Sequence, residues 1–112
     1  MSRSIYGDVH SRTGLRAAFR EIRRDIAAAR TANALNELHR RSGYVVSLTR
    51  DARWQARFGE ELEAIRALAA EEFSRSVRAL NRRAERLGAD VRYEERWTPD
   101  EHAHHTPQGG AA

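Results

Sequence analysis

The sequence of 112 residues contains no cysteine, no lysine and no long apolar run. The absence of cysteine excludes disulfide frameworks, thiolate metal sites and cysteine nucleophiles. No stretch approaches the roughly 18 apolar residues of a membrane-spanning helix. The first 20 residues also lack an apolar run before a small-residue cleavage site, as a secretory signal would have. We therefore expect a cytoplasmic protein.

Large apolar side chains are scarce. Val, Ile, Leu and Phe together supply 20 residues, whereas alanine alone supplies 19. Disordered chains share such a low content of Val, Ile, Leu and Phe, but they usually carry a high net charge. Here the formal net charge is only +4. We expect the chain to fold around a thin core, which favours an elongated helical hairpin or an oligomer over a compact globule.

All 20 basic residues are arginine, and they are unevenly balanced by acids. Residues 1–57 hold 12 arginines and 5 acidic residues, while residues 58–112 hold 8 arginines and 11 acidic residues. This asymmetry indicates either a basic partner surface in the first half or two halves that complement each other. Arginine suits forked contacts with phosphate or carboxylate, although a coding bias toward arginine explains its spread along the whole chain more simply.

A first helix is predicted over residues 14–41, with Thr13 as its N-cap and Gly43 just past its end. Its apolar stripe recurs at spacings of 4, 3, 4 and 3, in Leu15, Phe19, Ile22, Ile26 and Ala29. Leu35 and Leu38 fall away from this stripe, after Asn33. Either the helix bends near residues 31–33, or its second half uses another face, which is the reading we favour.

A longer helix is predicted over residues 51–87, after a short apolar connector at residues 44–48. Its stripe contains Trp54, Phe58, Leu62, Ile65, Ala69, Phe73, Val77, Leu80, Ala84 and Leu87. Gly59 indicates a bend near its start, and Gly88 is a suitable residue just past its end. Such a helix would be about 55 Å long, so it must lie along a partner helix.

The spacing of the apolar residues changes after this helix. Residues 90–97 are predicted to form an extended arm that docks through Tyr93 and Trp97. The domain organisation expected is a flexible N-terminal arm at 1–13, one helical domain at 14–97 and a disordered tail at 98–112. The tail carries His102, His104 and His105. Imidazoles bind metals, but a site needs rigid converging ligands, so we expect a polar tail, no metal site and no cofactor.

No catalytic residues are predicted, and the chain is expected not to be an enzyme. The sequence has no nucleophile elbow, no P-loop and no dinucleotide fingerprint. Neighbouring carboxylates do occur at Glu94 and Glu95, but general acid–base catalysis needs a water-poor cleft, which a thin hairpin does not offer. These carboxylates more simply balance the charges of Arg92 and Arg96.

The fold predicted is all-α: an antiparallel hairpin of two long helices with the C-terminal arm, dimerising into a four-helix bundle. The function expected is that of a non-enzymatic interaction or oligomerisation module, a homo-oligomer with a helical protein partner as a further option and no membrane partner. Its oligomer interface would contain Trp54, Phe58, Leu62, Ile65, Phe73, Val77, Leu80 and Leu87.

The alternative function is that of a nucleic-acid-binding accessory protein. One flank of the first helix collects arginines, and each arginine that contacts a phosphate releases a counterion. The contact residues would be Arg12, Arg16, Arg20, Arg23 and Arg30. No DNA-reading motif accompanies them, and charges on such a flank also pair with neighbouring helices in coiled coils.

Overall fold

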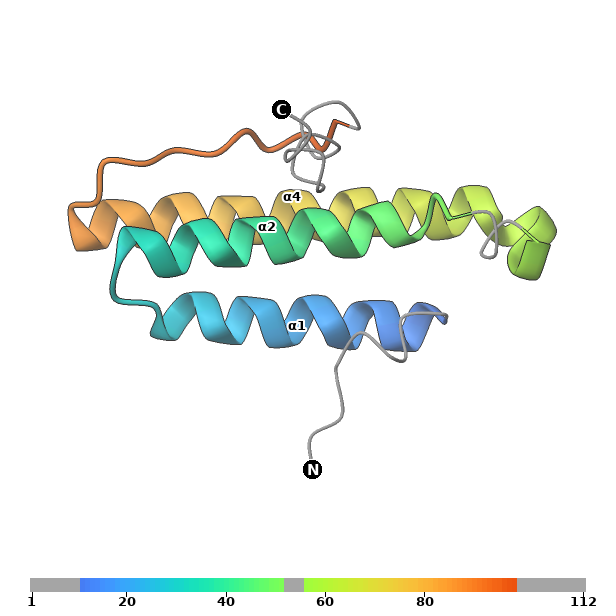
Figure 1. The fold of residues 1–112 in the computed structure, drawn as a ribbon. Helices are drawn as coiled ribbons and strands as arrows, with labels where there is room; N and C mark the ends of the chain where they lie inside the picture. Colours follow the sequence, from blue (N-terminus) through green and yellow to red (C-terminus); the bar gives the residue numbers. More distant parts are fainter. Residues whose placement is uncertain (1–10, 52–55, 99–112) are drawn as a thin grey trace, which may run out of the picture.

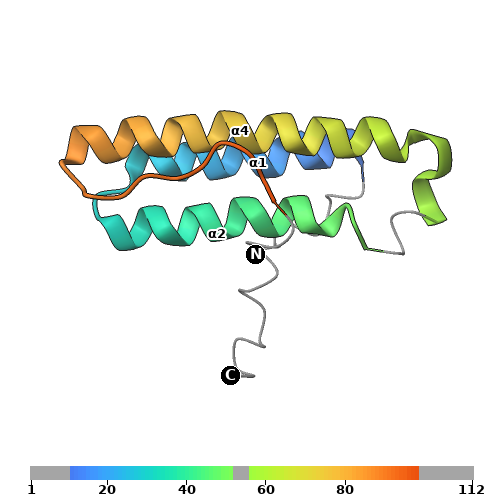
Figure 2. The same ribbon diagram turned by 90° about the horizontal axis from the view of Figure 1, so that it is seen from above.

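The computed structural model describes residues 11–51 and 56–98, and these form three helices that pack side by side (Figure 1). Helix α1 spans Arg12–Ala28, α2 spans Ala32–Leu48 and α4 spans Leu62–Leu87. All three pairs of helices are in contact. Helices α1 and α4 run in the same direction and α2 runs opposite to both (Figures 1 and 2). The all-α prediction is confirmed for the described residues.

The prediction of one continuous helix over 14–41 is wrong. Helix α1 ends at Ala28, Ala29 is extended (φ −68°, ψ 142°), and the Thr31 side chain accepts a hydrogen bond of 3.1 Å from the Ala34 N–H at the start of α2. Because the chain turns here, Leu35 and the α1 stripe both face the core, which one straight helix could not achieve. Asn33 is exposed beside the turn.

Two predicted ends also differ. The N-cap of α1 is Ser11, whose Oγ accepts from the Gly14 N–H at 2.9 Å, and not Thr13. Helix α2 does not stop before Gly43 but continues through the connector to Leu48. The reason is burial: Val45 and Val46 lie in the core, and tertiary packing outweighs the low helix propensity of one glycine.

The predicted helix over 51–87 is interrupted near its start and ends where expected. Gly59 has φ +51° and opens the short 3-10 helix η2, Gly59–Glu61, which leads into α4. Gly88 follows α4 in the left-handed conformation, with φ +69°. Both glycines therefore have the roles that the sequence indicated.

The core lies along the axis where the three helices meet, and its residues are almost inaccessible to water. Its largest members come mainly from successive turns of α1 and α4: Leu15, Phe19, Ile22 and Ile26 of α1, Leu35 and Val45 of α2, and Ile65, Phe73, Val77 and Leu80 of α4. The apolar ridge of α4 is thus covered by α1 and α2 of the same chain.

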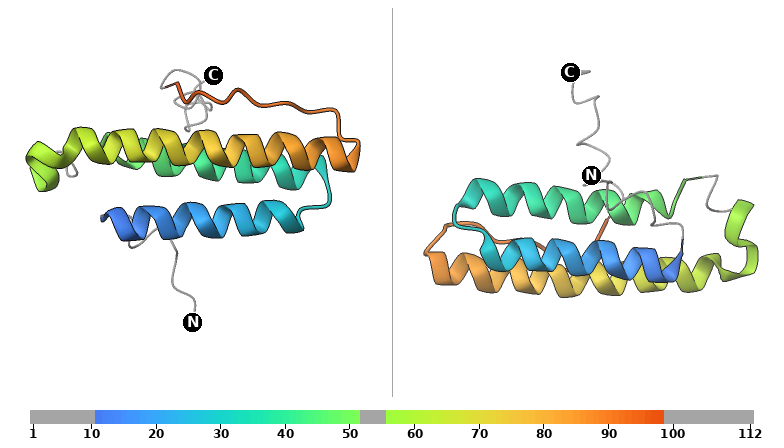
Figure 3. Two further views of the ribbon diagram at one scale, coloured as in Figure 1. Left: turned by 180° about the vertical axis from the view of Figure 1, so that it is seen from behind. Right: turned by 90° about the horizontal axis from the view of Figure 1, so that it is seen from below.

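Residues 89–98 form the extended arm, which runs back over α2 and α4, on the side of α4 away from α1 (Figures 2 and 3). The Asn81 side chain accepts from the Tyr93 N–H at 2.9 Å and donates to its carbonyl oxygen at 3.0 Å. The Tyr93 ring stacks on His39, with 4.5 Å between centroids, and burial raises the pKa of its phenol above 10.0. The Trp97 indole N–H donates to the Gly43 carbonyl at 3.3 Å. Docking through Tyr93 and Trp97 is confirmed.

Some predictions lie outside the described residues. They concern the N-terminal arm at residues 1–10, Trp54, and the tail at 99–112 with His102, His104 and His105. Residues 12 and 13, which were assigned to the N-terminal arm, belong to the first turn of α1.

Candidate anion-binding site

Two rows of arginines flank the contact between α1 and α4. On α1 the row consists of Arg16, Arg20 and Arg23, and Ala27 continues the same face. Arg30 is exposed in the turn that follows the helix. On α4, Arg75, Ala79, Arg82 and Arg86 recur at spacings of 4, 3 and 4, which also places them on one face. Because α1 and α4 are parallel neighbours, the two rows form one surface. We call these arginines, with Arg83, the arginine face.

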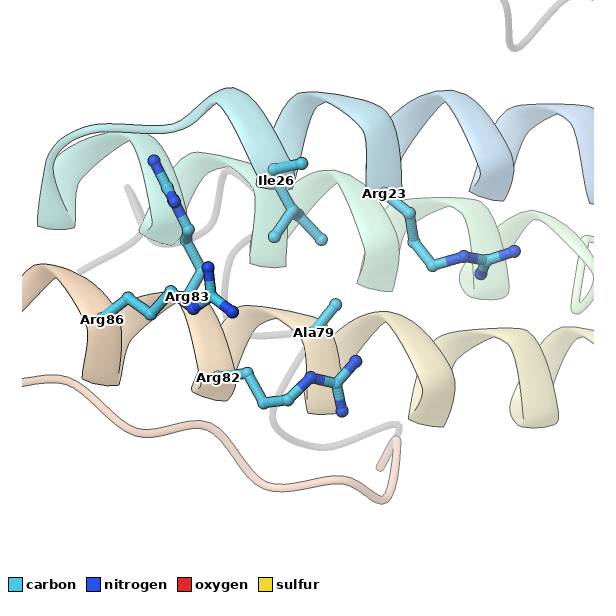
Figure 4. A pocket seen from close by; sticks show the side chains of 7 residues that line it. Arg23, Ile26, Ala79, Arg82, Arg83 and Arg86 are labelled. Atoms are coloured by element: carbon cyan, nitrogen blue, oxygen red, sulfur yellow. The ribbon is translucent and has the colours of Figure 1, made fainter.

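A surface hollow of about 250 Å³ lies in the arginine face, between the last turns of the two helices (Figure 4). Its lining consists of Arg23, Ile26 and Ala27 from α1, and Ala79, Arg82, Arg83 and Arg86 from α4. The lining therefore combines four arginine side chains with a small apolar floor, and it includes no carboxylate. The guanidinium groups of Arg23 and Arg83 are directed away from one another (Figure 4), each toward its own partner in the bundle. We call this feature the arginine hollow.

Two of the four arginines are held in place from within the bundle. Arg23 donates to Glu72 Oε1 at 2.8 Å and to Ser76 Oγ at 3.3 Å, and the Glu72 side chain is only 6% exposed. Arg83 donates through Nε to the carbonyl oxygen of Ala29 at 2.9 Å. Each guanidinium carries five N–H donors, so these contacts fix the two groups without using all of their donors.

The other two arginines of the hollow carry charges that nothing neutralises within residues 11–51 and 56–98. Arg82 and Arg86 are exposed and make no ion pair or hydrogen bond there. The same holds for Arg16 and Arg20 of the α1 row and for Arg30. Other arginines are paired, as Arg78 is with Glu95 at 3.1 Å and Arg41 with Asp25 at 3.8 Å. The arginine face is therefore a concentration of positive charge, and the carboxylate of Glu72 is buried beneath it.

The structure brings four of the five predicted nucleic-acid contacts onto this face. Arg12 lies at the far end of α1, where it pairs with Glu61 at 3.3 Å, well away from the hollow. Arg82, Arg83 and Arg86 were not predicted from the sequence. Their i, i+4 spacing was a usable signal, but the net negative charge of the second half of the chain concealed it.

The predicted oligomer interface lies largely in the core of the chain itself. Phe73 is 1% exposed, and Ile65, Val77 and Leu80 are fully buried. Phe58, Leu62 and Leu87 are partly exposed. Burial against α1 and α2 accounts for the ridge without a second copy, and the dimer itself stays a prediction.

The fold is a bundle of three α-helices, in which α1 and α4 are parallel and α2 is antiparallel to both. An extended arm covers α2 and α4, and a basic face lies between the first and last helices. Comparisons with family models, with curated proteins and with solved structures found no match for this chain. In the part of the chain that the structure describes, no three potential metal ligands gather into a cluster. None of the described helices has the length and apolar character to cross a bilayer.

Proposed function

We propose that the protein is a non-enzymatic binding module that holds the phosphate backbone of a nucleic acid on its arginine face. The observation that carries the proposal is the joining of two arginine rows, from helices far apart in sequence, around a hollow without a carboxylate. Cationic side chains that replace condensed counterions supply most of the affinity of sequence-independent binding.

The geometry favours recognition of the backbone over recognition of the bases. Within α1, the stretch from Arg16 to Arg23 rises by about 11 Å at 1.5 Å per residue, and Arg30 lies in the turn beyond the end of the helix. The row can therefore reach more than one phosphate of a strand. No aromatic ring lines the hollow, so it offers no platform on which bases could stack. Five arginines of the face lack a protein partner among the described residues, so pairing within the bundle does not account for them.

The proposal does not build on the dimer or on a helical protein partner. Both were inferred from an apolar ridge that the chain covers with its own helices. Among the described residues, Tyr44 is the one large hydrophobic side chain that is exposed, at 54%. One aromatic ring is a small basis for a protein interface, since stable interfaces bury roughly 800 Å² on each partner.

Fluorescence anisotropy with a labelled, hydroxyl-ended oligonucleotide at several salt concentrations tests the proposal. We expect affinity to fall steeply with salt, with a slope of log K against log salt of about −0.7 to −0.9 for each phosphate contacted. The double variant Arg16→Gln/Arg20→Gln should reduce this slope by about 1.5. Both residues are exposed and make no ion pair in the described chain, so folding should be unaffected.

The control is Arg92→Gln/Arg96→Gln, which removes the same two charges from the arm on the other side of α4. It should leave the slope nearly unchanged. No binding at low salt, or an equal loss in both double variants, would show that the arginine face is not the binding surface.

A further inference from the structure

We infer that the arginine hollow is a discrete site for an oligophosphate group, a diphosphate or a triphosphate, and that it anchors the partner at one end of the arginine face. The inference deepens the proposed function, because it names the chemistry that the hollow selects. A group of this kind occurs either free in solution or at the end of a nucleotide, and the two sources share the chemistry that the hollow recognises.

The density of charge is the first argument. Four arginine side chains line about 250 Å³. Glu72 balances the charge of Arg23, and the other three have no carboxylate partner among the described residues, whereas a phosphodiester strand brings one negative charge per nucleotide. A strand passing over the hollow would therefore leave most of these groups unneutralised. A diphosphate or triphosphate concentrates several charges in the space of one nucleotide, and it presents many acceptor oxygens to the forked donors of arginine.

The position of the hollow is the second argument. It lies in the last turns of α1 and α4, and these parallel helices bring the negative ends of two helix dipoles to the same end of the bundle. An anion would be repelled there without compensating charge. Arg83 donates a hydrogen bond to one carbonyl oxygen at this end, that of Ala29. Its side chain also lines the hollow. The other arginines of the hollow carry more positive charge than is needed to offset the two helix ends, because each end is equivalent to only about half a negative charge.

Size and preorganisation are the third argument. The hollow measures about 250 Å³, so it can admit linked phosphates but not a folded macromolecule. Arg23 is fixed by Glu72 and Ser76, while Arg82 and Arg86 keep their donors free in the described chain. The exposed guanidinium groups of Arg82 and Arg86 would close on a compact anion beside Arg83, which its bond to the Ala29 carbonyl already orders, and this limits the loss of conformational freedom.

Isothermal titration of the full-length chain with sodium tripolyphosphate, pyrophosphate, orthophosphate and sulfate tests the inference. We expect tripolyphosphate to bind at least tenfold more tightly than orthophosphate or sulfate, with pyrophosphate between them. A nucleoside triphosphate in a parallel titration distinguishes the sources. Tighter binding than tripolyphosphate would indicate a nucleotide end that also uses the apolar floor, and equal or weaker binding would indicate the free oligophosphate.

The decisive variant is Arg82→Gln/Arg86→Gln, compared with Arg92→Gln/Arg96→Gln as the charge-matched control. The first should weaken tripolyphosphate binding at least tenfold, and the second should change it less than twofold. The inference is overturned if tripolyphosphate binds no better than sulfate, or if both variants lose affinity equally. Hydroxyl-ended oligonucleotide binding that persists in that case would leave the proposed function standing. Tripolyphosphate binding without oligonucleotide binding would support the hollow and refute the proposed function.

Discussion

At the scale of single residues, Glu72 determines how the arginine face is built. Its carboxylate is buried at the contact between α1 and α4, where it accepts from Arg23 at 2.8 Å and from Arg75 at 3.5 Å. A buried charge is tolerated when it is paired and hydrogen-bonded. Glu72 therefore stabilises the contact between the helices and orients one guanidinium of the hollow, while the more exposed Arg75 adds little.

Replacing Glu72 by alanine should lower the free energy of unfolding by about 2 kcal/mol, because hydrogen bonds to charged groups contribute roughly 1.5–3 kcal/mol and Arg23 would lose its carboxylate. Denaturant unfolding followed by circular dichroism measures this effect. Glu71→Ala is the matched control. That neighbour is exposed and makes no ion pair in the described chain, so its loss should change the free energy by under about 0.5 kcal/mol. Equal effects of the two substitutions would contradict the structural role of Glu72.

At the scale of elements, the breaks between helices fix which side chains meet. The turn at Ala29–Thr31 contains no glycine or proline, and its sequence carries only the capping residue Thr31 as a signal. The break near Gly59 was indicated by that residue itself. The α1 stripe, the end of α4 and the docking of the arm could be predicted locally. The turn could not, because its advantage is tertiary: it directs Leu35 and Leu38 into the core that α1 already lines.

Gly59→Ala distinguishes the broken helix from a continuous one by the sign of its effect. In a continuous helix over 51–87, alanine would stabilise by about 1 kcal/mol relative to glycine. In the structure Gly59 has φ +51° and no atom lies within 4 Å of an added Cβ. The strain of an alanine at positive φ therefore determines the effect of the substitution. We expect the free energy of unfolding to fall by about 1–2 kcal/mol.

Asparagine tolerates the left-handed conformation better than alanine, so Gly59→Asn should destabilise less than Gly59→Ala. Thermal and denaturant unfolding of the two variants give the comparison. A rise in stability for Gly59→Ala would restore the continuous helix as the better description.

At the scale of the whole molecule, the number of helices decides where the arginines of α4 come to lie. In the predicted hairpin of two helices, the second would run antiparallel to the first and bring Arg82 and Arg86 beside the N-terminal end of α1. With α2 inserted, α4 runs parallel to α1 and brings them beside Arg23 and Arg30 instead. Half of the candidate site could be predicted from the local periodicity of α1. The other half depended on this topology and was beyond the reach of local patterns.

The same topology changes what is expected of the oligomeric state. The sequence predicted a second copy because the apolar stripe from Trp54 to Leu87 is long whereas large apolar residues are scarce. In that hairpin the stripe had a single partner helix within the chain. The structure supplies two, α1 and α2, and leaves the part of the stripe from Ile65 to Leu80 at most 1% exposed. Large burial of this kind within one chain predicts a folded state whose stability does not depend on association.

We therefore expect the unfolding midpoint to be independent of protein concentration between about 1 and 100 μM, because only an oligomer gains stability by mass action. Circular dichroism melts across this range provide the measurement, with sedimentation at the same concentrations as a check on mass. A dimer coupled to folding would instead show a midpoint that rises steadily with concentration. That result would mean that the ridge is shared between copies, with α1 or α2 exchanged for the equivalent helix of a partner.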